Sequence, residues 1–189
     1  MSHMTLDDFE ARYRSDPDPW SYETSPYERD KYAATLEACG AGPFRHALEL
    51  GASIGVLSER LAERCRRLTT IDGAPTAVAA ARRRLAGRPG IEVILGPIPE
   101  AIPAARYDLV LASEILYYLE ADALAATFGR LRACAARGAR LIAVHWRGVG
   151  PERPFTAADV HRALHEQPWL EPVSAAGTSD YLLDVFTIR

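Results

Sequence analysis

The stretch that decides the fold is His46–Gly55, which reads HALELGASIG. A short apolar run ends there in an acid and a glycine, and apolar residues then recur at helical spacing. This pattern predicts a buried strand, a tight turn and an amphipathic helix. Glycine at positions 51 and 55 permits backbone dihedrals and close approaches that a Cβ would prevent. We expect the turn to present free N–H groups at a helix N-terminus, in the crevice where open α/β sheets bind ligands.

Glu49, just before the turn, indicates which ligand the turn accepts. Its charge would repel the pyrophosphate of a dinucleotide, whereas a ligand with a cationic end and ribose hydroxyls would tolerate it. The acid therefore favours S-adenosylmethionine over NAD. Taken alone, Glu-x-Gly-x-x-x-Gly is also compatible with an ordinary strand–helix turn.

Asp72 stands at the end of the next predicted strand, residues 68–71. An acid at this place hydrogen-bonds the ribose hydroxyls of adenosine ligands in folds of this type. The alternative is an N-cap for the helix that begins near Pro75. Together with the glycine turn, Asp72 predicts a nucleoside site more specifically than either feature does alone.

The rest of the chain alternates predicted strands and helices. Strands are expected over 44–50, 68–71, 91–95, 107–112 and 139–146, and helices over 5–14, 28–39, after Gly55, and over 75–86, 122–136 and 156–166. Such alternation of apolar strands with helices predicts a parallel sheet covered on both faces. Near the end, 169–175 and 181–188 flank the turn GTSD, which predicts an antiparallel hairpin at one edge. The expected fold is an α/β, Rossmann-like three-layer sandwich with a seven-stranded, mostly parallel sheet.

The residues before the first strand are predicted to form a unit of their own. Residues 1–4 read as a cloning remnant, 5–40 as a helical lid segment and 41–189 as the ligand-binding domain. The segment contains prolines and the aromatic residues Trp20, Tyr22 and Tyr27. It could simply pack on the core, but aromatic faces attract a sulfonium as they attract other cations. The aromatic content therefore favours a lid over the ligand.

The composition is that of a soluble globular protein: 189 residues, 48% hydrophobic, 25% charged, with net charge −3. We expect no nucleic-acid partner, because no dense basic patch is present. The arginines that cluster are expected on helix ends and outward faces: Arg64, Arg66, Arg67 and Arg82 to Arg84. No apolar run approaches the ~20 residues that span a bilayer, so no membrane partner is expected.

Three widely spaced cysteines, Cys39, Cys65 and Cys134, indicate neither a disulfide framework nor a zinc site. Reduced thiols in a cytoplasmic protein account for them. His161 and His165 have the i, i+4 spacing of metal ligands on a helix, but no third ligand accompanies them in the sequence. We therefore expect no metal.

Polar residues end the fourth and fifth predicted strands, at the same edge of the sheet as the glycine turn. Ser113 and Glu114 end the fourth strand, and His145 ends the fifth. Glu114 could accept hydrogen bonds from an amine, or stabilise the N-terminus of the following helix. His145 could take a proton from an attacking amine as a neutral imidazole, or be a structural residue.

With these residues named, the chain resembles the class I S-adenosylmethionine-dependent methyltransferases, and more closely the nodulation protein S family of N-methyltransferases. The resemblance rests on Asp18–Trp20, Ser25–Tyr32, Ala47–Gly51, Ile54-Gly55, Ile71-Asp72, Ser113–Leu119, His145–Arg147 and Val160-His161. The N-terminal, Tyr-Tyr and His-Trp-Arg blocks are more specific than the cofactor motif, which all class I enzymes share.

The resemblance implies the class I methyltransferase fold, S-adenosylmethionine as cofactor, S-adenosylhomocysteine as product, and an amine of a deacetylated chitooligosaccharide as acceptor. The expected cofactor-site residues are Trp20, Tyr22, Tyr27, Glu49, Gly51, Ala52, Ser53, Gly55, Asp72, Gly73 and Ser113. Glu114, Tyr117 and His145 are expected to face the acceptor. Two positions depart from the family pattern: Ala52 replaces the usual cysteine, and Gly96-Pro97 replaces the acid that usually binds the adenine amino group.

The predicted function is methyl transfer to the nitrogen of a small-molecule amine, with an aminosugar as the family's suggestion. Two rivals remain at this point. One is a protein of the same fold that binds S-adenosylmethionine without catalysis, and the other is a nucleotide-dependent oxidoreductase. The sequence leaves the oligomeric state open.

Overall fold

The computed structural model describes residues 3–150 and 152–189, so Met1 and Ser2 of the predicted N-terminal remnant lie outside the described residues. Within these ranges seven strands form one sheet: β1 (Ala47–Leu50), β2 (Leu68–Asp72), β3 (Ile91–Leu95), β4 (Tyr107–Ser113), β5 (Ala135–Trp146), β6 (Leu170–Gly177) and β7 (Tyr181–Ile188). The helices are α1 (Leu6–Ser15), α2 (Pro26–Cys39), α3 (Val56–Ala62), α4 (Pro75–Arg84), α5 (Ala121–Cys134) and α6 (Ala157–His165), with a 3-10 turn η1 (Leu116–Tyr118).

The sheet has the order β3-β2-β1-β4-β5-β7-β6. Strand β1 pairs in parallel with both β2 and β4, whereas β7 runs antiparallel to β5 and to β6. The predicted parallel sheet with an antiparallel hairpin at one edge is confirmed. Because the chain first builds outward from β1 through β2 to β3 and then returns to β4, the order reverses between β1 and β4. Crevices at such a reversal are where open α/β sheets bind ligands.

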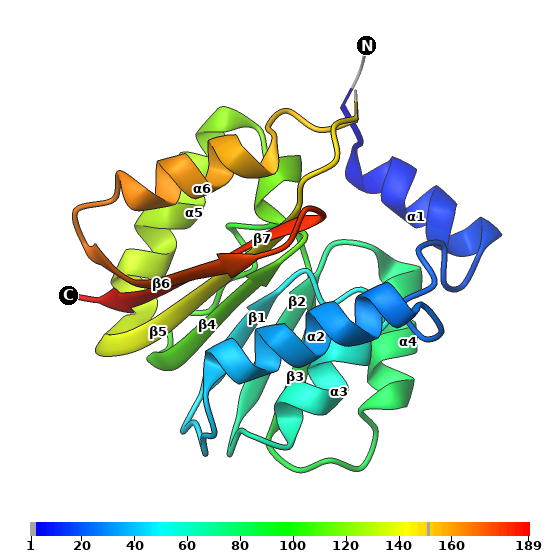
Figure 1. The fold of residues 1–189 in the computed structure, drawn as a ribbon. Helices are drawn as coiled ribbons and strands as arrows, with labels where there is room; N and C mark the ends of the chain where they lie inside the picture. Colours follow the sequence, from blue (N-terminus) through cyan, green and yellow to red (C-terminus); the bar gives the residue numbers. More distant parts are fainter. Residues whose placement is uncertain (1–2, 151) are drawn as a thin grey trace.

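Helices cover both faces of this sheet, with α5 and α6 on one face and α2, α3 and α4 on the other (Figure 1). Strand β4 contains the uninterrupted apolar run Leu109–Ala112, whose side chains are buried on both faces of the sheet. Leu109 and Leu111 pack into the layer beneath α2 and α3, while Val110 and Ala112 pack into the layer beneath α5 and α6. Each fully buried leucine stabilises the fold by about 2 kcal/mol relative to an exposed one. A strand buried on both faces therefore carries no alternation in its sequence.

Two strands differ from the predicted bounds by more than two residues at one end. Strand β1 is shorter, since Phe44 forms only an isolated bridge to Cys65 before regular pairing begins. Strand β5 is longer, because the chain leaves α5 directly into extended structure and Ala135 pairs with Tyr107 across a register shift. Neither difference moves the carboxyl ends of the strands, where the site lies.

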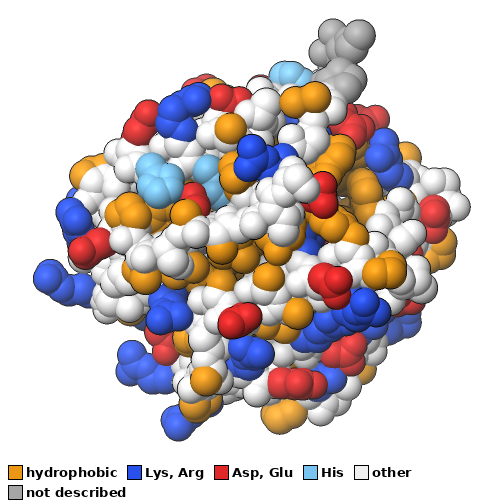
Figure 2. Space-filling view, viewed as in Figure 1, with side chains coloured by type: hydrophobic (Ala, Val, Ile, Leu, Met, Phe, Trp, Pro, Cys, Tyr) orange, Lys and Arg blue, Asp and Glu red, His pale blue; other side chains and the backbone are white. Residues whose placement is uncertain are grey.

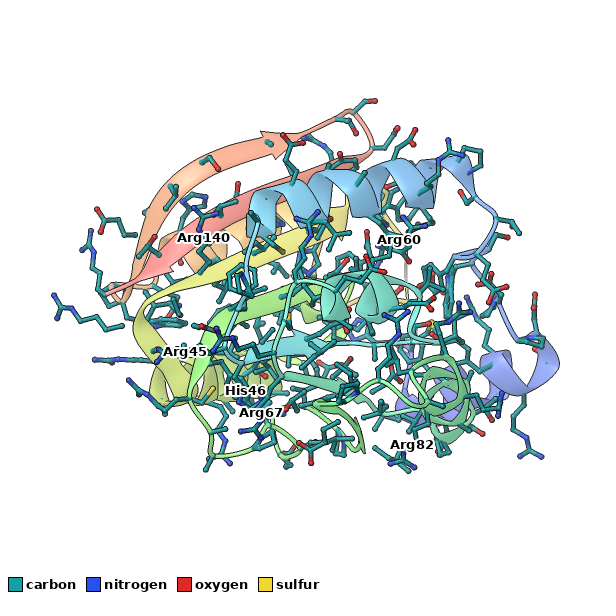
Figure 3. The ribbon with its side chains drawn as sticks, turned by 90° about the horizontal axis from the view of Figure 1, so that it is seen from below. Arg45, His46, Arg60, Arg67, Arg82 and Arg140 are labelled. Carbon is teal, nitrogen blue, oxygen red and sulfur yellow. The ribbon has the colours of Figure 1, made fainter. Side chains whose placement is uncertain are left out.

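The clustered arginines divide into two kinds. Arg66, Arg67, Arg82 and Arg83 are exposed as expected, and Figure 3 shows Arg67 and Arg82 at the periphery of the molecule. Arg64 and Arg84, in contrast, are half-buried and donate to backbone carbonyls, Arg64 to Leu36 and Gly40 and Arg84 to Ile54. The expectation of a uniformly solvated cluster is therefore wrong for these two, because their long side chains reach carbonyls left over at helix and loop ends.

Helix α1 begins as predicted, with Thr5 as N-cap in a capping box with Asp8. It rests against α4, where Glu10 accepts hydrogen bonds from the Thr76 backbone amide at 2.8 Å and from its hydroxyl at 2.6 Å. The backbone amide of Met4 also donates to the Glu152 carbonyl. These contacts anchor α1 beside the carboxyl ends of the strands. Among the described residues, we find no helix with the length and apolarity needed to cross a bilayer.

Candidate active site

A cavity of about 440 Å³ lies at the carboxyl ends of the central strands, under α1 and the start of α2. Figure 2 shows hydrophobic side chains gathered around a hollow on this face. Its walls include most residues that the sequence singles out: Trp20, Tyr22, Tyr27, Glu49, Gly51, Ala52, Ser53, Asp72, Gly73, Ser113, Glu114 and Tyr117. We call the wall formed by Glu49, Gly51–Ser53 and Asp72 the β1–β2 side. The β4–β5 side is formed by Glu114, Tyr117 and Trp146, with Glu28 and Lys31 of α2.

The turn after β1 requires its first glycine. Gly51 has φ +75°, and a Cβ there would lie 3.0 Å from the Cβ of Ile115. Gly55, with φ +82°, is the N-cap of α3, and its missing side chain faces Ala81 behind the cavity wall. The two glycines therefore have different roles. Gly51 shapes the cavity, and Gly55 allows two helices to pack closely together.

Three successive amides of this turn are already bonded. Gly51 and Ala52 both donate to the Ile71 carbonyl at 2.9 Å, and Ser53 donates to Asp72 Oδ2 at 2.8 Å. The expectation that the turn presents free N–H groups is wrong for these three, because the end of β2 is close enough to accept from them. A turn whose amides are used in this way does not offer the anion-binding nest that a pyrophosphate needs.

Asp72 joins two loops through its carboxylate. Oδ2 accepts from the Ser53 amide, and Oδ1 accepts from the Ala74 amide at 2.9 Å, next to the start of α4. The N-cap interpretation of Asp72 is wrong, because Ala74 is the N-cap of α4; Asp72 instead holds the amide of that cap residue and lines the cavity. Burial raises its pKa, and the backbone hydrogen bonds oppose that rise. Each carboxylate oxygen has a second lone pair with which to accept a hydroxyl of a ligand.

Glu49 is buried at the base of the β1–β2 side. Its Oε2 accepts from the Ser58 hydroxyl at 2.5 Å and the Thr70 hydroxyl at 2.7 Å. Burial raises the pKa of this carboxyl to about 7, although the two hydroxyls act in the opposite direction. A cation bound in the cavity would favour the charged carboxylate and draw the pKa back down.

Aromatic rings from the N-terminal segment form the cover of the cavity. The ring of Trp20 lies 5.4 Å from Tyr13 and 5.8 Å from Tyr22, centroid to centroid. The Tyr13 hydroxyl reaches Ser53 Oγ at 2.6 Å, so the cover touches the glycine turn itself. Such stacked and tilted rings form a wall that suits an apolar or cationic ligand.

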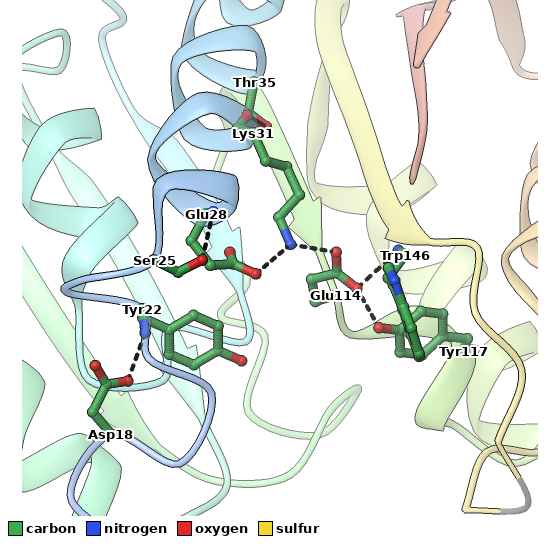
Figure 4. A network of polar contacts seen from close by, with 9 residues as sticks. All are labelled: Asp18, Tyr22, Ser25, Glu28, Lys31, Thr35, Glu114, Tyr117 and Trp146. Atoms are coloured by element: carbon green, nitrogen blue, oxygen red, sulfur yellow. Dashed lines mark hydrogen bonds and ion pairs between the residues drawn. The ribbon is translucent and has the colours of Figure 1, made fainter. Parts of the chain in front are cut away.

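The β4–β5 side is an ion-pair network drawn in Figure 4. Lys31 Nζ donates to Glu114 Oε1 at 2.7 Å and to Glu28 Oε1 at 3.0 Å. Glu114 Oε2 accepts from the Trp146 backbone amide at 3.0 Å and from the Tyr117 hydroxyl. The Lys31 side chain is only 1% exposed, so this lysine neutralises charge inside the protein. Sequence reasoning did not single out Glu28 and Lys31, because a Glu-x-x-Lys pair on a helix usually lies on the surface.

Glu114 itself adopts φ +56°, in the left-handed region. A residue other than glycine held there costs of order 1–3 kcal/mol, and such residues cluster at functional sites. Its hydrogen bonds run to Lys31, Tyr117 and Trp146. Glu114 therefore organises the cavity wall, rather than stabilising the start of η1.

His145 lies behind this wall. It is fully buried, with its ring 4.9 Å from that of Tyr117. Nε2 accepts from the Leu116 amide at 3.2 Å, and Nδ1 lies 3.1 Å from His161 Nε2. Because β5 points this side chain into the layer beneath α6, the expectation that His145 faces the acceptor is not met in this geometry. Burial lowers its pKa well below the ordinary value, and the nearby charges of Lys31 and Arg153 act in the same direction.

The predicted structural interpretation of the histidine pair fits what is observed. His161 Nδ1 and His165 Nε2 lie 2.8 and 2.9 Å from the same Asp184 oxygen. This carboxylate fixes the His161 tautomer, which leaves Nε2 to accept from His145 Nδ1. In the part of the chain that the structure describes, no group of three or more histidine, cysteine or acidic side chains is arranged to hold a metal.

Arg153, from the loop before α6, completes the β4–β5 side of the cavity. No sequence pattern predicted a role for this residue. Its guanidinium lies 4.5 Å from the ring centroid of Tyr117 and 4.9 Å from that of Trp146, and it donates to the Gly148 carbonyl. A loop residue can reach these rings only once β5 and η1 are side by side. The stacked cation holds both aromatic side chains in place.

The strand order, the antiparallel seventh strand and the acid-glycine turn with Asp72 define a class I methyltransferase fold. The chain belongs to the nodulation protein S (NodS) family, whose model matches residues 6–142.

Curated relatives are nodulation protein S proteins. That of Sinorhizobium fredii (strain NBRC 101917 / NGR234) is 35% identical over 104 residues, which are 54% of this chain and 48% of the relative. That of Rhizobium tropici is 36% identical over 103 residues, 54% of this chain and 43% of the relative. The matched stretch thus spans about half the length of these relatives. The crystal structure of N-methyltransferase NodS from Bradyrhizobium japonicum WM9 in complex with S-adenosyl-L-homocysteine aligns with a TM-score of 0.87 at 26% identity, covering 98% of this chain and 100% of that one.

Proposed function

We propose that this protein transfers the methyl group of S-adenosylmethionine to the nitrogen of a small-molecule amine. The observation that carries the proposal is one cavity whose β1–β2 side suits a nucleoside with a cationic end and whose β4–β5 side presents carboxylates to an amine. Membership of the NodS family and the likeness to an N-methyltransferase that binds S-adenosylhomocysteine support it.

The residues of the β1–β2 side fit this donor. Asp72 has lone pairs for the ribose hydroxyls, and Glu49 offers a carboxylate whose charged form a cation stabilises. Gly96 and Pro97 line the cavity where the family usually has an acid, so the adenine would be held by backbone groups and by van der Waals contact. Trp20, Tyr22 and Tyr27 are proposed to lie over the donor as a lid. The division into residues 5–40 and 41–189 remains part of this proposal.

S-adenosylmethionine supplies an activated methyl group with a sulfide leaving group. The protein's task is then to hold the nitrogen, the methyl carbon and the sulfur in line, and positioning of this kind can contribute several kcal/mol to catalysis. The network around Glu114 is proposed to orient the acceptor. Lys31 and Tyr117 keep its carboxylate in one place, and the site must also keep the nitrogen unprotonated.

We assign His145 a positioning role in this function. Its bond to the Leu116 amide and its contact with the Tyr117 ring fix η1, and η1 carries the tyrosine that bonds Glu114. Its two ring nitrogens are engaged by Leu116 and His161, which leaves no lone pair directed at a substrate within the described part of the site. An aminosugar or deacetylated oligosaccharide is the acceptor class that the family resemblance implies.

The free thiols of Cys39, Cys65 and Cys134 support a role in the reducing cytoplasm. The oxidoreductase alternative is disfavoured by the bonded turn amides and by Glu49. The alternative of binding without catalysis is disfavoured by the buried, strained Glu114 network, which nucleoside binding alone does not need.

Calorimetric titration with S-adenosylmethionine, S-adenosylhomocysteine, NAD and NADP tests the donor. Micromolar binding of the first pair, with no heat from the dinucleotides, is expected. Incubation with labelled S-adenosylmethionine and a panel of amines, including glucosamine and a deacetylated chitooligosaccharide, tests turnover. Preferential dinucleotide binding would overturn the proposal, and binding without methylation of any amine would favour the non-catalytic alternative.

A further inference from the structure

We propose that Glu28, and not Glu114 or His145, is the catalytic base that takes the proton from the acceptor amine. This inference rests on the proposed function and assigns the proton transfer within it. It comes from the distribution of hydrogen bonds over the two carboxylates that flank Lys31 in Figure 4.

Glu114 is occupied. One oxygen accepts from Lys31, and the other accepts from the Trp146 amide and the Tyr117 hydroxyl. A substrate proton therefore meets no Glu114 oxygen that lacks a protein donor. Its backbone conformation fixes the side chain as well, which suits a group that orients its neighbours.

Glu28 is differently placed. Its Oε1 accepts from Lys31, whereas Oε2 is buried and has no partner of normal hydrogen-bond geometry among the described residues; the Tyr32 hydroxyl interacts with the carboxyl without such a bond. The residue is 7% exposed and lines the cavity. A buried carboxylate oxygen without a partner carries a large desolvation cost, unless a ligand donates to it. The hydroxyl of Tyr27, the preceding residue, is likewise without a partner in the described part of the chain and also borders the cavity.

The charged groups around Glu28 also favour proton transfer to it. Burial and the charge of Glu114 raise its pKa, while Lys31 and the Tyr32 hydroxyl oppose that rise. Tyr22 and Tyr27 face it as neutral phenols. Lys31 and the donor's sulfonium would both disfavour a third cation in this small volume. Burial thus makes proton transfer to Glu28 less costly, while repulsion from Lys31 and the sulfonium would lower the pKa of a bound ammonium.

The step balances as follows. The ammonium of the acceptor gives one proton to Glu28 Oε2, which yields the neutral amine and a carboxylic acid. The nitrogen lone pair then forms the bond to the methyl carbon while the carbon–sulfur bond breaks and its electron pair stays on sulfur. The products are S-adenosylhomocysteine and a methylated ammonium, and Glu28 returns its proton to solvent after release.

Glu28→Gln tests the proposal, because the amide can still accept from Lys31 but cannot take a proton. We expect the affinity for S-adenosylhomocysteine to stay within about threefold of that of the parent. We expect kcat with glucosamine to fall by about 100-fold or more, which is within the range for loss of a general base. Below the amine's own pKa, the residual rate should rise tenfold per pH unit, following the neutral amine in solution. Glu37→Gln, on the exposed face of the same helix, is the matched control and should behave as the parent.

The outcomes separate the two proposals. If the parent protein methylates glucosamine or another amine of the panel, but Glu28→Gln keeps its rate within threefold and its pH profile, the assignment of Glu28 is overturned and the proposed function stands. If the parent methylates no amine, both fall. Should Glu28→Gln fail to fold, Glu28→Asp decides, because a shortened base should lower kcat and shift the acidic limb of the profile. An unchanged limb would overturn the assignment.

Discussion

The two sides of the cavity are built in different ways. On the β1–β2 side the polar partners are near one another in the chain, as in the bond from Ser53 to Asp72, which spans 19 positions. On the β4–β5 side the central bond, from Lys31 to Glu114, spans 83 positions. The first side follows from a strand, a turn and a helix in succession. The second exists only when α2 lies across the ends of β4 and β5.

The two sides of the cavity also differ in the interactions that stabilise their charged side chains. Backbone amides satisfy Asp72, so the chain's own turn geometry provides its partners. Lys31 bonds both Glu28 and Glu114, so each carboxylate depends on this one cation. A buried cation between a buried and a half-buried carboxylate is costly to disturb, because removing it leaves uncompensated charge. We therefore expect mutations on the β4–β5 side to affect stability and those on the β1–β2 side to affect ligand affinity.

The largest effect is expected for Lys31→Met. Glu28 would remain buried, and Glu114 half-buried, without their cation, and the free energy of unfolding should fall by about 3–5 kcal/mol. Urea denaturation followed by circular dichroism measures it. Addition of Glu114→Gln should recover part of the loss, because one buried charge is removed. A loss below about 1 kcal/mol would mean that the network behaves like a solvated surface pair.

Next in size is Asp72→Ala, which should weaken S-adenosylhomocysteine binding about 100-fold, since the proposed hydrogen bonds to the ribose hydroxyls and the bond that holds the Ser53 amide are lost. Calorimetry measures the affinity. Asp108→Ala is the matched control, because Asp108 also accepts from two backbone amides, those of Arg45 and His46, at the opposite end of the sheet. Equal weakening in both variants would show that the effect is structural and would contradict a direct contact.

A smaller effect is expected from the titration of Glu49. The cationic end of the donor prefers the carboxylate, and the pKa is raised to about 7 by burial. S-adenosylmethionine should therefore bind roughly tenfold more tightly at pH 8 than at pH 6. Glu49→Gln should abolish this dependence. Without ligand, the sign is reversed for stability: the folded state holds this proton more tightly than the unfolded chain, so the contribution of Glu49 weakens as pH rises from 4.5 towards about 7.

The smallest effect concerns the contact of the N-terminal segment with the turn. Tyr13→Phe removes one hydrogen bond to Ser53 Oγ and should weaken S-adenosylhomocysteine binding about threefold to tenfold. Ser53→Ala should have a similar effect, and the double variant should be no weaker than either single one. Additive losses in this cycle would show that the two hydroxyls act separately, contrary to a lid fastened at this point.

Much of the fold follows from local patterns in the sequence. The run before Gly51 predicts a buried strand, Thr5 predicts a helix start and GTSD predicts the hairpin, and each is observed, because periodicity, caps and turns depend on neighbouring residues. The meeting of Glu49, Asp72 and Ser113 at one cavity follows as well, because the carboxyl ends of parallel strands lie at one edge of the sheet.

Other features arise only when distant segments pack. Glu28 and Lys31 have the pattern of a surface helix pair, and their burial depends on α2 crossing the sheet. His145 lies at the end of a strand, as other candidate site residues do. Its side chain, however, is on the face of β5 that packs against α6, so its ring points towards that helix. Local patterns therefore determined the sheet and the β1–β2 side of the cavity. Long-range packing decided which charges are buried together on the acceptor side, because burial and electrostatic pairing depend on the whole surroundings of a group and not on its neighbours in the chain.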